Sequence, residues 1–312
     1  MASMMRSKRQ ACQKRMKSGS LSTKGKTMGK KTKITTFEST WNPVTGCYHN
    51  CPYCYAKRIA ERFGGISLND LYHGETWKNV GDAERPMYEV RKAQCKQTVN
   101  GESVAAPYPF GFLPTLHGYR LDEPQAWKTP KDIFVCSMAD LFADYIPDEW
   151  IAKVFDACKQ APQHRYFFLT KNPERYVKLF NLGLIPEGHD NFWFGTTVTS
   201  SEQFFFFRES TNCFLSIEPI MGYFPVFNIE PQKGKKLTDM EQKLKDAGYN
   251  LKNLGIRWII VGAETGNRKG RVIPEREWID NIRESCDKYG IALYMKDSLR
   301  ELMGEGFRQE KI

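Results

Sequence analysis

The feature that most limits the possible folds is a regular alternation of short apolar segments with amphipathic ones between residues 131 and 295. Runs such as 165–169 and 257–261 have the length and the β-branched or aromatic content of buried strands, whereas 147–160 and 275–289 repeat apolar residues at helical spacing. Strands that alternate with helices form parallel βαβ units. We expect six or seven such strands, so the sequence predicts an α/β fold with a partial (β/α)6, TIM-like barrel rather than a closed eightfold one.

The predicted strands of this alternation are 132–136, 165–169, 191–198, 213–217, 257–261 and 291–295. The predicted helices are 147–160, 174–181, 275–289 and a segment capped by Ser200 or Ser201 that runs to Ser210. Upstream, the sequence predicts a strand at 32–37 and a helix at 56–63 whose apolar face is Ala56, Ile59, Ala60 and Phe63. Two insertions are expected, at about 67–130 with a helix at 85–97, and at 228–254 with a helix at 238–247.

The first insertion is long and irregular for a compact barrel, and it includes the aromatic, proline-rich segment 107–114. Loops of this length are often functional, so one interpretation is a cover over the site. The alternative is a solvated decoration with a small apolar cluster of its own.

Three cysteines with the spacing C-x3-C-x2-C, Cys47, Cys51 and Cys54, lie in the loop between the first predicted strand and helix. Three soft ligands this close suit an iron–sulfur cluster or zinc. A 4Fe–4S cluster held for electron transfer usually takes four thiolates, so a trio leaves one iron with an open position. His49 provides the alternative, because it could complete a zinc site of three cysteines and one histidine.

The spacing, with the aromatic Tyr53 just before the last cysteine, resembles the radical S-adenosylmethionine (SAM) superfamily. The resemblance implies that SAM chelates the open iron through its amino and carboxylate groups. One electron then breaks a C–S bond of the sulfonium, and the resulting radical abstracts hydrogen from a substrate, which is chemistry of the cofactor more than of the protein. It also implies a reductant such as a ferredoxin or flavodoxin as a partner.

Charge is unevenly distributed along the 312 residues. The net charge is +10, but residues 1–33 contain eleven lysines and arginines and no acid, so the rest of the chain is nearly neutral. We expect residues 1–33 to be a disordered basic tail that binds nucleic acid non-specifically, or a leader upstream of an alternative start at Met28. The remainder is expected to form a barrel at 34–300 and a tail at 301–312. Its near-neutral charge argues against a broad surface that binds along the phosphate backbone of a nucleic acid.

Cysteine use and hydropathy bear on the compartment. Nine cysteines form an odd set without the spacing of a disulfide scaffold. No signal peptide and no apolar run of about 18 residues is visible, which argues against a membrane protein. The sequence therefore predicts a cytoplasmic protein.

Polar residues follow each predicted strand. In parallel barrels the carboxyl ends of the strands point into one mouth, where catalytic groups collect. We therefore expect a lined pocket that faces the same mouth as the cysteine loop. Its candidate residues are Ser137, Asp140, Lys171, Thr197, Thr199, Glu218, Glu264, Lys296 and Asp297.

Five ordered blocks carry a closer resemblance: WNPVTGC at 41–47, SMADLF at 137–142, FLTK at 168–171, FLSIEP at 214–219 and VGAETG at 261–266. They resemble an uncharacterised phage and prophage family that is treated as radical-SAM-like and has no assigned reaction. The resemblance runs from about Thr35 to Ser298. The segment Cys51-Pro52-Tyr53-Cys54 departs from it, because this loop is more compact than usual in that family and is nearer to the general superfamily spacing.

The block order is also similar, more distantly, to the spore photoproduct lyase branch of the superfamily. That resemblance implies that Ser137, Lys171 and Thr197 or Thr199 bind the methionine part of SAM. Lys171 would pair with the carboxylate of SAM, while the hydroxyls or Asp140 would accept hydrogen bonds from the ammonium of SAM. The alternatives are a surface lysine and hydroxyls that only cap strand ends.

Other residues of the predicted site have two interpretations each. Tyr53 packs on the adenine of SAM or on the barrel wall. Cys136 occupies the place of a cysteine that returns a hydrogen atom to a product radical in the lyase branch, or it is a small buried hydrophobe. Glu218 and Glu264 are candidate catalytic residues that, like Lys296, contact substrate or belong to a salt-bridge network.

The sequence therefore predicts a radical SAM enzyme whose Cys47, Cys51 and Cys54 hold a 4Fe–4S cluster. A nucleic acid or nucleobase is the expected substrate, on fold analogy alone. Two alternatives stay open at this point. One is a non-catalytic protein that binds zinc structurally and associates with nucleic acid through its tail, and the other is a cluster-bearing regulator that never cleaves SAM.

Overall fold

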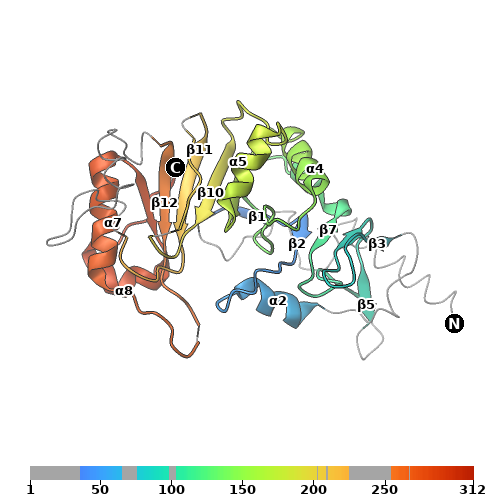
Figure 1. Cartoon of the computed structure of the whole chain (residues 1–312), viewed down its shortest axis with the longest axis horizontal. Helices are drawn as coiled ribbons and strands as arrows, with labels where there is room; N and C mark the ends of the chain where they lie inside the picture. Colours follow the sequence, from blue (N-terminus) through green and yellow to red (C-terminus); the bar gives the residue numbers. More distant parts are fainter. Residues whose placement is uncertain are drawn as a thin grey trace. The chain divides into compact units, whose positions relative to one another are not determined.

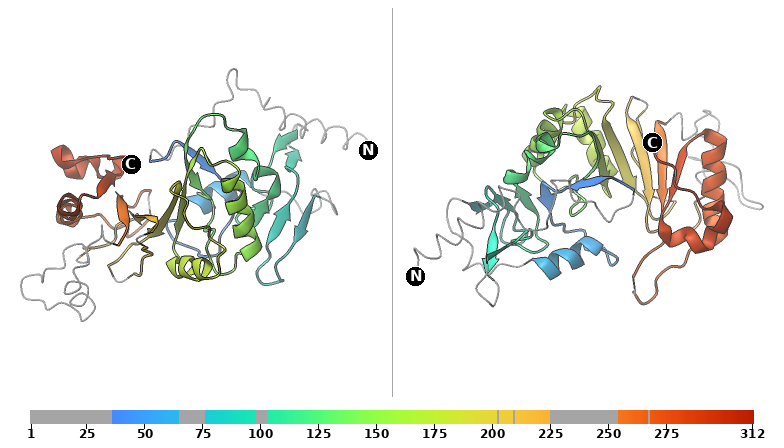
Figure 2. Two further views of the ribbon diagram at one scale, coloured as in Figure 1. Left: turned by 90° about the horizontal axis from the view of Figure 1, so that it is seen from above. Right: turned by 180° about the vertical axis from the view of Figure 1, so that it is seen from behind.

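The computed structural model describes residues 36–64, 76–97, 103–201, 203–208, 210–224, 254–266 and 268–312. The chain divides into two compact units, which we describe separately (Figures 1 and 2). Among the described residues, the first unit holds 37–141 and 146–164, and the second holds 142–145 and most of 165–312. The predicted basic tail at 1–33 and the predicted helix at 238–247 lie outside the described residues.

The strands of the first unit form a parallel pair and two small sheets. β1 (Ser39–Trp41) runs parallel to β8 (Asp132–Val135). A four-stranded sheet has the order β2 (Val44–Thr45), β7 (Thr115–His117), β4 (Tyr88–Val90), β3 (Trp77–Asn79), and β5 (Cys95–Gln97) pairs with β6 (Ser103–Ala105). The helical elements are α2 (Tyr55–Phe63), the 3-10 turn η1 (Gly118–Arg120), α3 (Glu123–Ala126) and α4 (Asp148–Lys159).

Only the last two residues of the first predicted strand, at 32–37, are described, and they are not in a strand. Thr36 and Phe37 lie in a turn and a bend, and β1 begins only at Ser39. Trp41 fixes this position, because its side chain is fully buried, its backbone pairs with Val135 and its indole N–H donates to the carbonyl of Arg120 at 2.8 Å. The β-forming character of Thr36 and Phe37 is therefore not enough to place them in a strand.

The predicted helix at 85–97 is wrong, because this segment contains β4 and β5. Tyr88 stacks on Phe110 with ring centroids 3.7 Å apart, and Trp77 packs edge-on against both rings. Val90 is buried with Ala106 and Phe110. Pairing with distant strands thus overrode local propensity, and the insertion has an apolar cluster of its own, as the second interpretation predicted.

Helix α2 was predicted to within one residue, but only half of its predicted apolar face is buried. Ala56 and Ala60 pack against Met138, whereas Ile59 and Phe63 are 37% and 49% exposed. Its N-cap is Cys54 and its C-cap is Gly64. Helix α4 matches its prediction, with Ile151, Val154, Phe155 and Cys158 all buried.

The second unit contains a five-stranded parallel sheet. Its strands are β9 (Arg165–Thr170), β10 (Phe192–Thr197), β11 (Asn212–Ile217), β12 (Ile256–Val261) and β13 (Ala292–Met295), and they neighbour one another in chain order. The helical elements are α5 (Pro173–Asn181), α7 (Arg276–Tyr289), α8 (Arg300–Met303), and the 3-10 turns η3 (Asp297–Leu299) and η4 (Gly304–Gly306). Helix α7 contacts β13, the edge strand of this sheet, and Figure 1 shows it on the side of the sheet where β12 is labelled.

Sequential strand order separates this sheet from doubly wound folds, in which the order reverses at a switch point. Each crossover here steps in the same direction, as in barrels. The sequence predicts six or seven parallel strands. The five strands of this sheet and the parallel pair of the first unit, β1 and β8, make seven. The structure is therefore mixed α/β with barrel-like winding, and its assignment to the radical SAM type remains a proposal.

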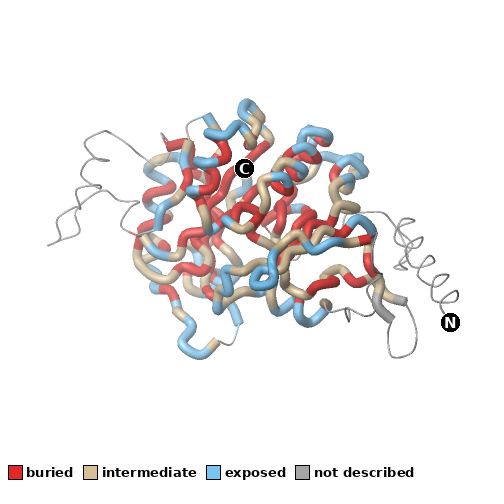
Figure 3. Tube along the Cα trace, turned by 45° about the vertical axis from the view of Figure 1, so that its right-hand side comes forward, coloured by how far each residue is buried: buried red, intermediate tan, exposed pale blue. Residues whose placement is uncertain are grey.

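The two faces of the five-stranded sheet differ in their packing. On one face Phe194 contacts Tyr176 and Phe180 of α5, with ring centroids 5.3 and 5.2 Å apart. We call the other the aromatic face, because Phe167, Trp193, Phe214, Trp258 and Tyr294 form a chain of ring contacts along it. Gly195 makes room there, since a Cβ at that position would lie 2.2 Å from the Phe214 ring. Most residues of these strands are buried (Figure 3).

The helix predicted to run from Ser200 or Ser201 to Ser210 is wrong for the part described, because residues 203–208 are not helical. Phe206 is instead buried against Phe180 and Phe194, and its N–H donates to the Thr196 hydroxyl at 3.0 Å. The buried phenylalanine holds this segment against the sheet as a loop.

The last residues of the chain, predicted as a tail, hydrogen-bond to the last two strands of the sheet. The Met295 N–H donates to the Arg308 carbonyl at 2.9 Å, and the Trp258 indole donates to the Glu310 carbonyl at 3.0 Å. In the ranges that the structure describes, none of the helices has the length and apolar character needed to cross a membrane.

Candidate functional site

The cysteine loop lies in the first unit, between β2 and α2, and not directly after the first strand as predicted. Cys47, Cys51 and Cys54 are all partly buried. Asn42 fixes the chain before this loop, because its side-chain oxygen accepts from the Ser137 hydroxyl at 3.1 Å and from the Met138 N–H at 3.0 Å. The structure thus brings the blocks WNPVTGC and SMADLF together.

Backbone N–H groups point at two of the three sulfurs. The N–H of His49 donates to Cys47 Sγ at 3.4 Å, and the N–H of Lys57 donates to Cys54 Sγ at 3.3 Å. Cys54 is the N-cap of α2, so its sulfur also lies at the positive end of the helix dipole. Hydrogen bonds to sulfur are among the contacts by which proteins tune iron–sulfur clusters.

The aromatic segment 107–114 of the insertion supports the loop. The Cys47 N–H donates to the Phe112 carbonyl at 3.1 Å. Phe112, Tyr108 and Cys54 pack against the same small apolar cluster, formed by Ala56, Ala60 and Met138. Gly46 has a φ of 86°, and a Cβ there would lie 2.2 Å from the Leu113 carbonyl oxygen. This close approach explains why glycine precedes the first cysteine.

A contact between the loop and the segment that follows β8 was missed by sequence reasoning. His49 Nε2 lies 3.1 Å from Asp140 Oδ2, and the Asp140 side chain is only 8% exposed. The sequence suggests His49 only as a zinc ligand and Asp140 only as an acceptor for SAM. The two residues are 91 positions apart, so the sequence carries no spacing signal for this contact.

The hydroxyl of Ser137 is used locally, because it donates to Asn42, and the Ser137 carbonyl accepts from the Tyr55 hydroxyl at 2.6 Å. These contacts join Ser137 to Asn42, which precedes the cysteine loop, and to Tyr55, which follows it. Tyr53 is partly buried. The roles predicted for both toward SAM stay predictions.

Cys136 comes directly after β8 and has a φ of 56°, in the left-handed region that non-glycine residues seldom adopt. Such a conformation costs about 1–3 kcal/mol and persists only where the surroundings enforce it. Burial raises the pKa of its thiol to about 12, so the sulfur keeps its proton at neutral pH. The residue therefore carries an S–H group, which both the hydrogen-donor and the buried-hydrophobe interpretations require.

The other predicted cofactor-binding residues belong to the second unit. Thr197 ends β10, is 8% exposed and pairs in register with Ser216 on the aromatic face. The Thr199 hydroxyl and N–H both donate to the Gln203 side-chain oxygen, as a local cap would. Lys171 follows β9 and is exposed.

The two candidate catalytic glutamates each form an ion pair in the second unit. Glu264 is almost fully buried and accepts from two guanidinium nitrogens of Arg268 at 2.5 and 2.6 Å. These hydrogen bonds lower the pKa of Glu264. Glu218 lies 3.5 Å from the ammonium of Lys296. The structure therefore shows the salt bridges of the second interpretation, and contact with substrate stays a prediction.

The predicted residues thus form one set in each unit. Cys136, Ser137, Asp140 and Tyr53 belong with the cysteine loop, and the second set contains Lys171, Thr197, Thr199, Glu218 and Glu264. A mouth shared by both sets stays a prediction.

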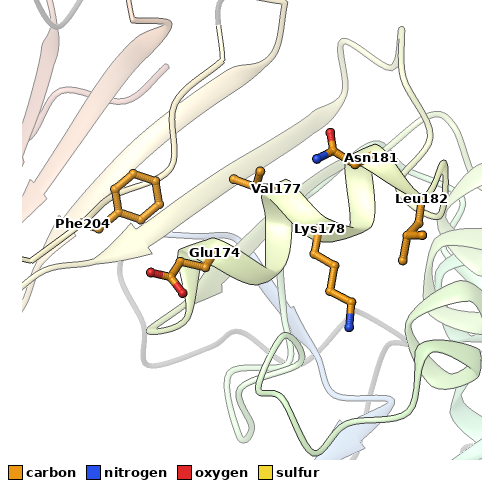
Figure 4. Close-up of a pocket in the computed structure, with 6 residues that line it drawn as sticks. All are labelled: Glu174, Val177, Lys178, Asn181, Leu182 and Phe204. Carbon is orange, nitrogen blue, oxygen red and sulfur yellow. The ribbon is translucent and has the colours of Figure 1, made fainter.

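An open hollow of about 600 Å³ lies on the outer side of α5 (Figure 4). None of its lining residues was predicted to be functional. They are Glu174, Val177, Lys178, Asn181, Leu182 and Phe204.

The donor atoms of the described residues bear on metal binding in two ways. Within the described ranges, no three His, Cys, Asp or Glu side chains are gathered so that they could hold a metal ion. The loop nevertheless has the donor chemistry of a soft-metal or iron–sulfur site, with three partly buried thiols and N–H groups directed at two sulfurs. Zinc with His49 as the fourth ligand would have to bind Nδ1 of this ring, because Nε2 faces Asp140.

Two solved structures are similar to this chain at low sequence identity. One is spore photoproduct lyase complexed with dinucleoside spore photoproduct, at 10% identity and a TM-score of 0.46, covering 88% of this chain and 81% of that one. The other is a cysteine-to-serine mutant of spore photoproduct lyase, at 11% identity and a TM-score of 0.45, covering 87% and 80%. No curated protein matches the chain. A family model described as "Protein of unknown function (DUF5131)" matches residues 31–300, so the chain belongs to that family.

Proposed function

We propose that this protein is a radical SAM enzyme in which Cys47, Cys51 and Cys54 hold a 4Fe–4S cluster. When bound, the cluster would supply the electron for reductive cleavage of SAM and so initiate hydrogen abstraction from a substrate. The observation that carries the proposal is the contrast between these three thiols and the other free cysteines.

Seven of the described cysteines are free, and Cys95 is disulfide-bonded. Four of the free ones are buried in strands, helices or strand ends, and burial raises the pKa of each of them: Cys136, Cys158, Cys213 and Cys286. A metal ligand must be a thiolate, so these four are poor candidates. The loop trio alone among the free cysteines of the described ranges is partly exposed and clustered in sequence.

The surroundings of the loop suit this role. Gly46 allows the chain to pass against the Leu113 carbonyl, and two backbone N–H groups are available to sulfur. The pair of His49 and Asp140 joins the middle of the loop to the segment that follows β8. These contacts hold the loop on both sides of Cys51 and leave the three loop thiols partly accessible.

SAM would be held by polar residues at strand ends. Lys171 and Thr197 are the candidates of this proposal, because they supply an exposed cation just after β9 and a hydroxyl at the end of β10. A lysine ammonium can pair with the SAM carboxylate, and a threonine hydroxyl can accept from its ammonium. A ferredoxin or flavodoxin as reductant, and a nucleic acid or nucleobase as substrate, complete the proposal.

The test is anaerobic purification and reconstitution, followed by metal and sulfide analysis and an assay for 5′-deoxyadenosine under reducing conditions. We expect about four iron and four sulfide ions per chain and reductive formation of 5′-deoxyadenosine. One zinc ion without sulfide would contradict the cluster. A complete cluster that never cleaves SAM would support a regulator instead of an enzyme.

A further inference from the structure

Glu218, Gly262 and Lys296 form a row just beyond the carboxyl ends of β11, β12 and β13. The strand residues that precede them are paired in register, Ile217 with Val261 and Val261 with Met295. The ladder continues past the strands, because the Gly262 N–H donates to the Ile217 carbonyl at 3.0 Å and the Lys296 N–H donates to the Val261 carbonyl at 2.8 Å. Residues in register on parallel strands share a face, so this row belongs to the aromatic face.

The missing side chain of Gly262 lets its two neighbours converge. A Cβ on Gly262 would lie 2.9 Å from Cγ of Lys296 and 3.4 Å from Cγ of Glu218. The two charged side chains therefore meet above the glycine, with Nζ 3.5 Å from Oε2. Beneath them the next row of the face, Ser216, Ile260 and Tyr294, is buried and forms a floor.

The pair keeps hydrogen-bonding capacity for a ligand. The Glu218 side chain is 39% exposed and that of Lys296 is 19% exposed. An ammonium has three donors and a carboxylate has about four acceptor sites, and one loose contact uses few of them. The result is a neutral unit that presents a donor beside an acceptor.

We propose that Glu218 and Lys296 bind the Watson–Crick edge of an unpaired nucleobase. Lys296 donates to the ring carbonyl or nitrogen acceptor, and Glu218 accepts from the adjacent N–H. This inference rests on the proposed function and narrows its substrate to a base that is single-stranded or turned out of a duplex. In a duplex the same edge is occupied by the pairing partner.

The chemistry favours a base over a peptide. A trans peptide bond directs its C=O and its N–H to opposite sides, so adjacent protein groups cannot reach both. Every nucleobase holds a donor and an acceptor side by side on its Watson–Crick edge. The near-neutral charge of the chain beyond its first 33 residues also suits recognition of a base better than tracking of phosphates.

The test is fluorescence anisotropy of the full-length protein with a short single-stranded oligothymidine, the same strand annealed to its complement, and an N3-methylthymidine version. We expect the duplex and the methylated strand to bind about tenfold more weakly than oligothymidine. Equal binding of the three probes, or no binding of oligothymidine, would overturn the proposal whatever the variants do.

Two variants then assign the preference to these side chains. Glu218→Ala and Lys296→Met should each bind oligothymidine about tenfold more weakly and lose the preference over the methylated strand. Glu218→Ala is the decisive one, because it makes the protein more positive and would tighten a contact that is only with phosphate. Tighter binding by Glu218→Ala, with the preference intact, would overturn the proposal. Circular dichroism checks that both variants fold.

Asp287→Ala is the matched control, since it removes an ion pair with Arg308 (2.7 Å) on the surface of α7. It should bind like the unmodified protein. The same assay on Cys51→Ala, which we expect to lack the cluster, separates the two proposals. Base preference without a cluster would support this inference even if the chain did not cleave SAM, and a SAM-cleaving protein without base preference would overturn it.

Discussion

The cysteine loop and the core of the same protein place one side-chain type in opposite environments. Cys47, Cys51 and Cys54 are partly buried in a polar loop with backbone N–H groups near two sulfurs. Cys136, Cys158, Cys213 and Cys286 are buried, and burial raises the pKa of each thiol. The comparison teaches that position within the fold, not the cysteine itself, decides which thiols are able to ligate a metal.

The largest expected effect is on metal content. Cys47→Ala, Cys51→Ala and Cys54→Ala should each lose nearly all iron and sulfide after reconstitution, because each removes a ligand from a set of three. Cys286→Ala, from the buried group, should keep its iron and lose only about 1 kcal/mol of unfolding free energy. Iron and sulfide assays with urea titrations measure both effects. If a folded Cys286→Ala variant also lost its iron, the division between metal-binding loop cysteines and buried cysteines would be contradicted.

Thiol reactivity should follow the same division. In the apo protein at pH 8, iodoacetamide should label the three loop cysteines at least about 100-fold faster than Cys136 or Cys286, because the thiolate is the nucleophile and burial excludes the reagent. Peptide mass spectrometry of timed samples gives the rate for each residue. Labelling of Cys136 at the rate of Cys51 would show that the buried group is not protected.

The raised pKa values also predict a loss of stability in alkali. The thiols of Cys136 and Cys286 have a pKa of about 12 in the folded protein, against an ordinary value of 9.0. The unfolded chain therefore loses these protons first, so their contribution to stability is complete below pH 9 and is lost as the pH rises toward 12. Urea unfolding across this range should show stability falling, and replacing Cys286 by alanine should flatten the fall.

A smaller effect is expected from a change in the backbone of the cysteine loop. Gly46→Ala should cost about 2 kcal/mol more unfolding free energy than Gly188→Ala, because both glycines have positive φ but only Gly46 faces a carbonyl where its Cβ would be. Chemical denaturation compares the two variants, and iron content shows whether the loop has also lost its shape. Equal costs would mean that the Leu113 carbonyl does not constrain the loop.

The smallest expected effect concerns SAM. Lys171→Ala should keep the cluster and weaken SAM binding about tenfold, since it removes a charge-assisted contact to the carboxylate. Lys178→Ala, an exposed lysine on α5, is the matched control and should leave SAM affinity unchanged. Equilibrium dialysis with labelled SAM measures both, and unchanged affinity in Lys171→Ala would remove this residue from the site.

Periodicity and composition were enough to predict the regular elements of the second unit. Strands β9 to β13 and helices α5 and α7 lie within two residues of their predicted bounds, because each is a buried run or an amphipathic repeat of ordinary length. The cysteine loop could also be recognised as a candidate site from the sequence, since its three candidate ligands are close together in the chain.

The rest depended on contacts between distant residues. Tyr88 stacks on Phe110 in a segment that forms strands where a helix was predicted. Phe206 is buried in a loop where another helix was predicted. The pairing of His49 with Asp140, and the convergence of Glu218 and Lys296 over Gly262, have no signature in local sequence. Such contacts are set by strand register and chain packing, which single-sequence patterns do not contain.

The central claim is that three loop thiolates hold a cluster with one iron open to SAM. Electron paramagnetic resonance of the reduced, reconstituted protein tests it most directly, with spectra recorded before and after SAM is added. The account predicts the signal of a reduced 4Fe–4S cluster whose g values shift on adding SAM. A signal that SAM leaves unchanged, or a protein that holds zinc and gives no signal, would contradict it.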